Sequence, residues 1–265
     1  GLWDVIEYMF PVAMTAFVTI GIYALRILGD YFVRMFLHKG YSFEQNNSLA
    51  PMVSICALSM IAVGLAAPAA MSHVREVIAI SIALASFFAT SAALLMIVML
   101  VIGFHSMLTH GIRPEAAPSL WLMIPITTLL GITFMRTAHG MGEAFGGHIS
   151  SGENYIVLMA IFSIQLIFGL IGFAVMKRLN YFKDFIYGEK THATTYALVC
   201  PGVALPVFGL FVVKFALMGN MLVMMWTPWM YLFLMPFLAI QLKTLQVLLT
   251  LVTKLQLVPA AARAP

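Results

Sequence analysis

The residues that could do chemistry in this chain are few, and most of them stand at the ends of apolar runs. All seven histidines lie at such ends or in loops, at His38, His73, His105, His110, His139, His148 and His192. A transmembrane haem needs facing histidines within the bilayer, and a metal site needs closely placed ligands. The glycines beside His139 indicate a loop rather than a ligand set. We therefore expect no catalytic residue, no metal and no cofactor, and we predict that the protein is not an enzyme.

Prolines form a second pattern, and they follow the apolar runs in alternation. Pro51 and Pro68 bracket the second run, Pro125 lies in the fourth, and Pro201 and Pro206 lie in the sixth. Proline lacks a backbone N–H and bends a helix, and a carbonyl freed in a membrane must face protein or water. The alternation predicts an inner ring of kinked helices and an outer ring of plain ones. The alternative is that membrane helices simply tolerate proline.

Small and hydroxyl residues collect in the same proline-bearing runs. They are Ser54, Ser59, Thr127, Thr128, Gly202 and Ala204. Hydroxyls and backbone dipoles attract an anion weakly, whereas a charged side chain at mid-membrane would hold it too tightly to pass. No run carries a charge at its centre. This pattern suits a path for small anions, and it equally suits a structural bundle.

The composition indicates that these residues are positioned by the apolar segments of a membrane protein. Of 265 residues, 62% are hydrophobic and 9% are charged, whereas an ordinary soluble domain has about 25% charged residues. A soluble globule of this size could not bury so much apolar surface, so a soluble enzyme, a nucleic-acid binder and a disordered linker are excluded. The net charge of +4 reflects few acids rather than a basic patch, and we expect no nucleic-acid partner.

Uncharged runs between the charges predict an all-α integral membrane protein. A helix needs about 20 apolar residues to cross the hydrocarbon core, and continuous runs exclude the alternating pattern of a barrel. The seven expected spans are 8–32, 50–70, 77–104, 118–137, 153–177, 192–217 and 221–241. We expect residues 1–257 to form a single transmembrane helical domain and residues 258–265 to form a loose tail.

The last helix is expected to continue past the membrane as an amphipathic extension over 242–257. Leu242, Leu245, Leu249, Val252 and Leu255 form its apolar stripe. Lys243, Gln246, Thr250 and Lys254 form a second stripe. This pattern is typical of a helix on the membrane surface or against a neighbouring subunit.

The distribution of Lys and Arg predicts the orientation. With seven crossings, the side opposite the N-terminus receives Arg34, Lys39, Arg113, Lys177, Arg178, Lys183, Lys190, Lys243, Lys254 and Arg263. The other side receives only Arg75 and Arg136, with Lys214 close to it. The N-terminus is therefore expected outside and the C-terminus in the cytoplasm. We expect the bacterial inner membrane.

Several segments resemble the tellurite-resistance/dicarboxylate transporter family, which includes the TehA-like channels and the plant slow anion channels. They are FEQNNSLAPMV (43–53), RPEAAPSLWLMIPITTLLGI (113–132), AHGMGE (138–143), FSIQLIFGLIGF (162–173) and TTYALVCPGVAL (194–205). AHGMGE is similar to a loop of the family, and the others are similar to the fifth, seventh, eighth and ninth helices or the approaches to them. The seven spans correspond to the last seven of the family's ten.

The resemblance implies hairpins around a central pore, a homotrimer, and transport of small anions. Together with the proline pattern, it assigns the pore lining to Ser54, Pro125, Thr128, Cys200, Pro201 and Ala204. The chain departs from the family in two ways. First, the resemblance leaves the family's three N-terminal helices without a counterpart, so we expect that the chain is part of a longer one, that the protein has lost them, or that another subunit supplies them. Second, the family's pore-blocking phenylalanine falls at Cys200, so the pore is more open, Phe208 or another aromatic residue closes it, or gating belongs elsewhere.

Three hypotheses follow for the function. The first is a TehA-like anion channel or exporter in the lipid bilayer. The second is a non-conducting subunit of a larger membrane complex, suggested by the missing helices, by Cys200 and by the amphipathic extension. The third and weaker one is a redox subunit that holds haem or quinone at histidines near the membrane surface.

Overall fold

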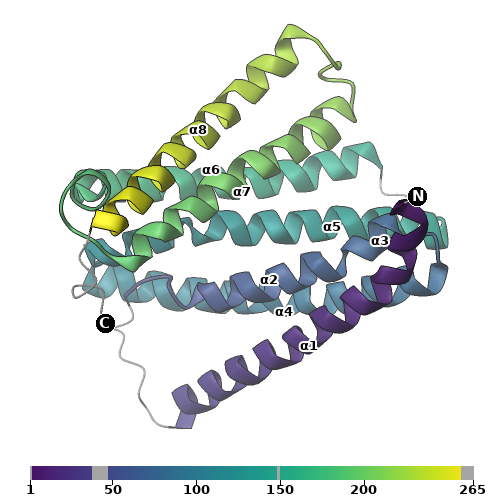
Figure 1. The fold of residues 1–265 in the computed structure, drawn as a ribbon, viewed down its shortest axis with the longest axis horizontal. Helices are drawn as coiled ribbons and strands as arrows, with labels where there is room; N and C mark the ends of the chain where they lie inside the picture. Colours follow the sequence, from purple (N-terminus) through teal and green to yellow (C-terminus); the bar gives the residue numbers. More distant parts are fainter. Residues whose placement is uncertain (1, 38–46, 148–149, 258–265) are drawn as a thin grey trace. The chain divides into compact units, whose positions relative to one another are not determined.

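The computed structural model describes residues 2–37, 47–147 and 150–257, and all regular structure within them is helical (Figure 1). Seven helical stretches are long and apolar enough to cross a membrane. They are Val5–Leu37, Met52–Met71, Arg75–His110, Pro114–Phe145, Ser151–Arg178, Ala193–Met218 and Pro228–Lys254. Within the described residues, the predicted number and order of long apolar helices are confirmed. The predicted loose tail, 258–265, lies outside the described residues.

The contacts divide the chain into two compact units. Unit 1 comprises residues 1–111 and 126–154, and unit 2 comprises residues 112–125 and 155–265. The single transmembrane domain expected over 1–257 stays a prediction.

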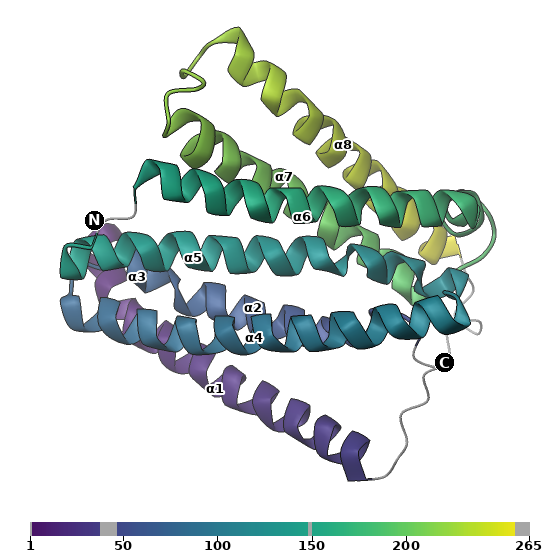
Figure 2. The same ribbon diagram turned by 180° about the vertical axis from the view of Figure 1, so that it is seen from behind.

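Unit 1 is built from long regular helices: α1 (Leu2–Leu37), α2 (Met52–Leu65), the short α3 (Ala67–Met71), α4 (Arg75–His110) and most of α5 (Met123–Phe145). Figures 1 and 2 show α2 and α4 running alongside each other. The core between them is formed by side chains such as Ile55, Leu58 and Ala85, each at most 1% exposed. The helix α4 ends where Gly111 turns to a positive φ of 74°, a conformation that glycine adopts without strain.

Unit 2 alternates regular helices with tighter and wider turns. It contains the 3-10 segment η1 (Pro114–Leu122), most of α6 (Ser151–Arg178), the π-helical turn η2 (Phe182–Tyr187) and the 3-10 segment η3 (Ala193–Leu198), followed by α7 (Val199–Phe211), the π-helical η4 (Val212–Met218) and α8 (Pro228–Leu257). The segment η1 begins at Pro114, a favoured first position for proline, and contains Pro118, which lacks a backbone donor. Asn180, with φ 54°, ends α6.

Burial differs sharply between the spans. In the most apolar stretch of each, 56% of residues are buried in Met52–Met71, 72% in Pro114–Phe145 and 39% in Ala193–Met218. The values are 17%, 22%, 17% and 0% for the spans of α1, α4, α6 and α8. Thus the second, fourth and sixth spans are the buried ones.

Proline burial follows the same division. Pro68, Pro125, Pro201 and Pro206 are buried in the second, fourth and sixth spans. The helices α1 and α8 also contain prolines, Pro11 and Pro236, but these are exposed. Hence the prolines inside the second, fourth and sixth spans are buried, apart from Pro114, which is exposed at the start of the fourth span.

Two predicted boundaries differ most from the structure. The fourth span continues to Phe145 instead of ending at 137, so the glycine-rich segment 138–143 is helical rather than a loop. The last span begins at Pro228 instead of 221. Residues Met221 and Trp226 have positive φ values of 57° and 62° there, and proline is well suited to the first position of a helix.

The apolar stripe expected on the C-terminal half of α8 is exposed. Leu242, Leu245, Leu249 and Val252 are 59%, 51%, 58% and 39% exposed. The helix itself runs without a break from Pro228 to Leu257. Its polar stripe instead contacts unit 2, through Lys243 and Lys254.

Candidate functional site

The six residues predicted to line a pore are divided between the two units. In unit 1, Ser54 is exposed on α2 and donates a hydrogen bond to the Pro51 carbonyl at 2.8 Å, and Thr128 is buried in α5 at 3% exposed. In unit 2, Pro125 is buried near the start of α5. Cys200, Pro201 and Ala204 share α7, where Cys200 is exposed and Pro201 is buried. Their role as a pore lining stays a prediction.

The helix α5 carries the buried hydroxyls of unit 1. Thr127, Thr128 and Thr133 are at most 5% exposed. The Thr133 hydroxyl donates to the Leu129 carbonyl of its own helix at 2.8 Å, and the Thr137 hydroxyl donates to the Thr133 carbonyl at 2.9 Å. Such bonds satisfy the hydroxyl proton and leave oxygen lone pairs and a local dipole.

Hydrogen-bond donors from two other helices converge at the break between α2 and α3, a feature that the sequence did not predict. The last carbonyls of a helix have no partner within it, and Pro68 provides no N–H just beyond this break. Arg136 of α5 donates from Nη1 to the Val63 carbonyl at 2.8 Å, and Ser81 of α4 donates to the Leu65 carbonyl at 2.6 Å. Side chains from two other helices therefore complete the end of α2.

Arg136 is a charged group inside a long apolar helix. It lies nine residues before the end of α5 at Phe145, or about 13 Å at ~1.5 Å per residue. The side chain is half-buried, and within the described part of the chain no carboxylate lies in ion-pair distance of it. Its positive charge therefore has only backbone partners. We had expected Arg136 at a span end because Gly140 and Gly142 suggested a loop.

Gly140 has a packing role inside α5. A Cβ added at Gly140 would clash with the Ala69 carbonyl of α3, so only glycine lets α5 approach that backbone. The helix ends instead at Gly146, with φ 71° and an N–H that donates to the Gly142 carbonyl at 3.1 Å. In the sequence, only the Gly146–Gly147 pair could have indicated that the helix ends there and not at Gly140.

Unit 2 has a core of stacked aromatic residues where α6 ends. Tyr181 is fully buried, its ring stacks on Phe185 with centroids 4.6 Å apart, and its hydroxyl donates to Thr195 Oγ1 at 3.0 Å. Burial raises the pKa of the Tyr181 hydroxyl above its ordinary value. This cluster holds η2 against η3.

Side chains from η3 and α8 fix the η2 turn and its neighbours. Lys254 of α8 donates to the carbonyls of Phe185 at 3.0 Å and Lys190 at 2.6 Å. Tyr196 of η3 donates in return to the Leu251 carbonyl of α8 at 3.0 Å. Through these bonds the polar stripe of α8 packs against η2, η3 and the loop between them.

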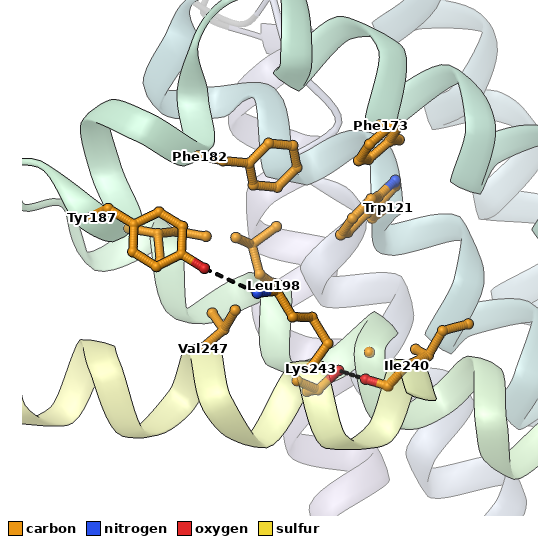
Figure 3. Close-up of a pocket in the computed structure, with 11 residues that line it drawn as sticks. Trp121, Phe173, Phe182, Tyr187, Leu198, Ile240, Lys243 and Val247 are labelled. Atoms are coloured by element: carbon orange, nitrogen blue, oxygen red, sulfur yellow. Dashed lines mark hydrogen bonds between the residues drawn. The ribbon is translucent and has the colours of Figure 1, made fainter. Parts of the chain in front are cut away.

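A pocket of about 470 Å³ lies within unit 2, between α8 and the aromatic side chains of η1, α6 and η2 (Figure 3). Its lining is Trp121, Phe173, Phe182, Ile186, Tyr187, Leu198, Gly202, Ile240, Lys243, Thr244 and Val247. Lys243 reaches from α8 toward Tyr187, and its ammonium donates to the Tyr187 hydroxyl at 3.1 Å and to Gln246 Oε1 at 3.0 Å. The sequence singled out Lys243 as part of a stripe but gave no sign of the pocket.

Histidine, cysteine and acidic side chains do not gather into a metal site in the part of the chain that the structure describes, where no group of three or more could hold an ion. Of the seven histidines, His38 and His148 lie outside the described residues. His73 and His139 are both exposed. A haem or quinone site at the histidines stays a hypothesis.

Comparison with known protein families, curated proteins and solved structures gives no match to this chain.

Proposed function

We propose that the protein is an integral membrane channel or exporter for small anions, of the TehA-like type. The observation that carries the proposal is the burial of the second, fourth and sixth spans. The second, fourth and sixth spans are 56%, 72% and 39% buried, whereas the other four are at most 22% buried. Helices that line a path need protein on most sides, while helices that face lipid stay uncovered in an isolated chain.

The chemistry of α5 supports anions as the permeating species. Its buried threonines supply dipoles along an apolar helix, and such dipoles attract an anion without trapping it. Arg136 adds one positive charge whose hydrogen-bond partner is the neutral Val63 carbonyl. A cation without a carboxylate partner keeps its field available to a passing anion.

The assembly and orientation belong to the same proposal. We propose the bacterial inner membrane, with the end carrying Lys177, Arg178 and Lys183 in the cytoplasm, as the excess of Lys and Arg indicates. The exposed apolar stripe of α8 supports contact with lipid or with a second copy in a homotrimer.

Anion efflux from liposomes tests the proposal. Purified protein is reconstituted into vesicles loaded with chloride, and efflux is followed with a chloride electrode after the membrane potential is clamped. We expect efflux well above that of empty vesicles. Efflux equal to that of empty vesicles, with the protein shown to be inserted and folded, would overturn the proposal.

Arg136 provides the sharper version of the experiment. Arg136→Gln removes the charge and keeps a hydrogen-bond donor for Val63, so we expect roughly a tenfold loss of flux, which corresponds to ~1.4 kcal/mol of lost attraction. Arg136→Lys should retain most of the flux. Arg75→Gln is the matched control, because Arg75 is exposed and contacts only the Phe145 ring in the described structure. Equal losses in Arg136→Gln and Arg75→Gln would contradict a role for the charge.

The second candidate is a non-conducting subunit of a larger membrane complex, which the exposed apolar stripe of α8 also supports. A stripe about half exposed in an isolated chain fits the groove of a partner as well as it fits lipid. Mild-detergent purification from native membranes distinguishes the two. A stoichiometric foreign subunit would support the complex, and a homotrimer without other proteins would rule it out.

A further inference from the structure

We propose that the pocket of unit 2 binds one acidic phospholipid, with an acyl chain among the aromatic and aliphatic side chains and the anionic headgroup on Lys243. The proposal rests on the membrane placement of the chain but not on anion conduction. The pocket, of about 470 Å³, falls within the range of ~300–1,000 Å³ typical of small-molecule sites.

The inner part of the pocket is apolar. Trp121, Phe173 and Phe182 stand on the side away from α8, and Ile240 and Val247 belong to α8 itself (Figure 3). The Trp121 indole N–H donates to the Gly169 carbonyl at 3.0 Å, so its one donor is already used. Only hydrocarbon and ring faces remain there to meet a ligand. An acyl chain satisfies this surface, and a small hydrophilic anion does not.

The outer part of the pocket is cationic. The Lys243 ammonium has three N–H donors and uses two of them on neutral groups, Tyr187 Oη and Gln246 Oε1. Among the described residues it forms no ion pair, and Asp184 of η2 is paired with Lys190 at 2.8 Å. Tyr187 is 58% exposed, so this end opens outward. A phosphate here would accept the remaining ammonium proton and the Tyr187 hydroxyl proton.

The position of the pocket fits a lipid at the membrane surface. Tyr187 and Phe182 belong to η2, which follows the basic end of α6 at Lys177 and Arg178. By the positive-inside rule this end faces the cytoplasm, whose leaflet is rich in acidic lipids. A zwitterionic headgroup would bring its own cation toward Lys243. Charge complementarity therefore selects an acidic phospholipid over a neutral one.

Close packing of α7 on α8 forms part of the pocket wall. A Cβ at Gly202 would clash with the Thr244 side chain, so the two helices touch at that point. Thr244 keeps its hydroxyl turned to the Ile240 carbonyl, at 2.8 Å. The wall is therefore fixed by contacts of the protein itself, which gives the pocket a defined shape before a lipid binds.

Tryptophan quenching measures occupancy directly. The other tryptophans, Trp3, Trp226 and Trp229, are replaced by phenylalanine so that Trp121 reports alone. The protein is placed in phosphatidylcholine vesicles that contain a minor fraction of brominated-chain phosphatidylglycerol or of brominated-chain phosphatidylcholine. We expect the acidic lipid to quench Trp121 with about fivefold higher apparent affinity than the neutral lipid. This ratio corresponds to ~1 kcal/mol, the attraction of one lysine or arginine to an acidic membrane surface. Equal quenching by the two lipids would overturn the proposal.

Two variants separate the headgroup from the chain. Lys243→Gln should remove the preference for the acidic lipid, and Lys177→Gln, an exposed cation at the same end of unit 2 that does not line the pocket, should preserve it. Val247→Phe fills the pocket and should reduce quenching by both lipids. A preference retained in Lys243→Gln, or lost equally in Lys177→Gln, would contradict a specific site.

Inorganic phosphate distinguishes a lipid from a free anion. Phosphate added to the vesicles should leave the quenching by brominated phosphatidylglycerol unchanged, because it cannot fill the apolar part. Full reversal by phosphate alone would assign the site to a soluble anion and overturn the lipid proposal. Anion efflux measured on Lys243→Gln keeps the two proposals apart, since unchanged efflux with lost lipid preference supports the pocket and leaves conduction intact.

Discussion

Unit 1 and unit 2 meet the same backbone requirement in different ways. Unit 1 consists of long α-helices with one break, between α2 and α3, and the carbonyls at that break receive Arg136 and Ser81. Unit 2 has two 3-10 segments and two π-helical turns, and it uses side chains at several points, such as Thr194 donating to the Glu115 carbonyl at 2.7 Å. At the α2–α3 break and around η2 and η3, donors from other elements bond to backbone carbonyls where the regular helix is interrupted.

This difference indicates how strongly the loss of a hydrogen-bond donor destabilises each unit. In unit 1 the interruption is deep in the core, since Ser81 is fully buried and Arg136 is half-buried. In unit 2 most of the replacing donors act near exposed loops, and Lys190 itself is exposed. A lost donor costs most where water cannot take its place. Changes in unit 1 should therefore destabilise the protein more than matching changes in unit 2.

The largest effect is expected at Gly140 of unit 1. Gly140→Val places a branched side chain against the Ala69 backbone, which cannot move aside as a flexible side chain could, and should lower the free energy of unfolding by ~3 kcal/mol. Titration with a denaturing detergent measures this loss. Gly29→Ala, where nothing lies within 4 Å of an added Cβ, is the control and should be neutral or slightly stabilising. Similar losses in both variants would contradict the close approach of α5 and α3.

A smaller loss is expected when the break in α2 loses a donor. Ser81→Ala leaves the Leu65 carbonyl unpaired in the core and should lower the free energy of unfolding by ~2 kcal/mol. Ser91→Ala removes an exposed hydroxyl that bonds only to its own helix at Phe87, and it should stay within ~0.5 kcal/mol of the native protein. The same detergent titration compares them, and a loss in Ser91→Ala as large as in Ser81→Ala would remove the distinction.

In unit 2 the corresponding change should have a milder and local effect. Lys254→Met frees the Phe185 and Lys190 carbonyls, and we expect a loss of ~1 kcal/mol because water reaches this loop. Hydrogen exchange of the amides in 182–190 should accelerate. Lys183→Met, which removes an exposed lysine from the same segment, should leave exchange unchanged. Faster exchange throughout unit 2 would mean that Lys254 holds more than this turn.

The smallest effect is a pH dependence carried by Tyr181 in unit 2. Its folded pKa is raised by burial, while tyrosine in an unfolded chain ionises near pH ~10. The unfolded state then loses its proton first, so the stability from this group is present below that pH and decreases as pH rises through it. Tyr181→Phe should show a shallower fall of unfolding free energy between neutral pH and strongly alkaline pH. Identical slopes in both proteins would contradict a buried, neutral Tyr181.

The sequence predicted the helices well because crossing a membrane is a matter of length and polarity. Seven uncharged runs match seven apolar helices of the described residues, but prolines also occur in α1 and α8, so proline alone does not mark the buried spans. The largest boundary error fell at glycines, at the end of α5. Gly140 permits a close approach of two helices, whereas Gly146 ends a helix. The residue type alone does not distinguish these two roles. Which role a glycine has depends on the partner that approaches it.

By itself the sequence determined an all-helical chain of seven apolar spans, because each span satisfies its own backbone and depends only on local composition. Tertiary structure alone decided which donors complete the broken backbone, as with Arg136 at Val63, and which side chains enclose the pocket at Lys243 and Tyr187. These contacts join residues more than fifty positions apart, since they are set by packing in space rather than by spacing along the chain.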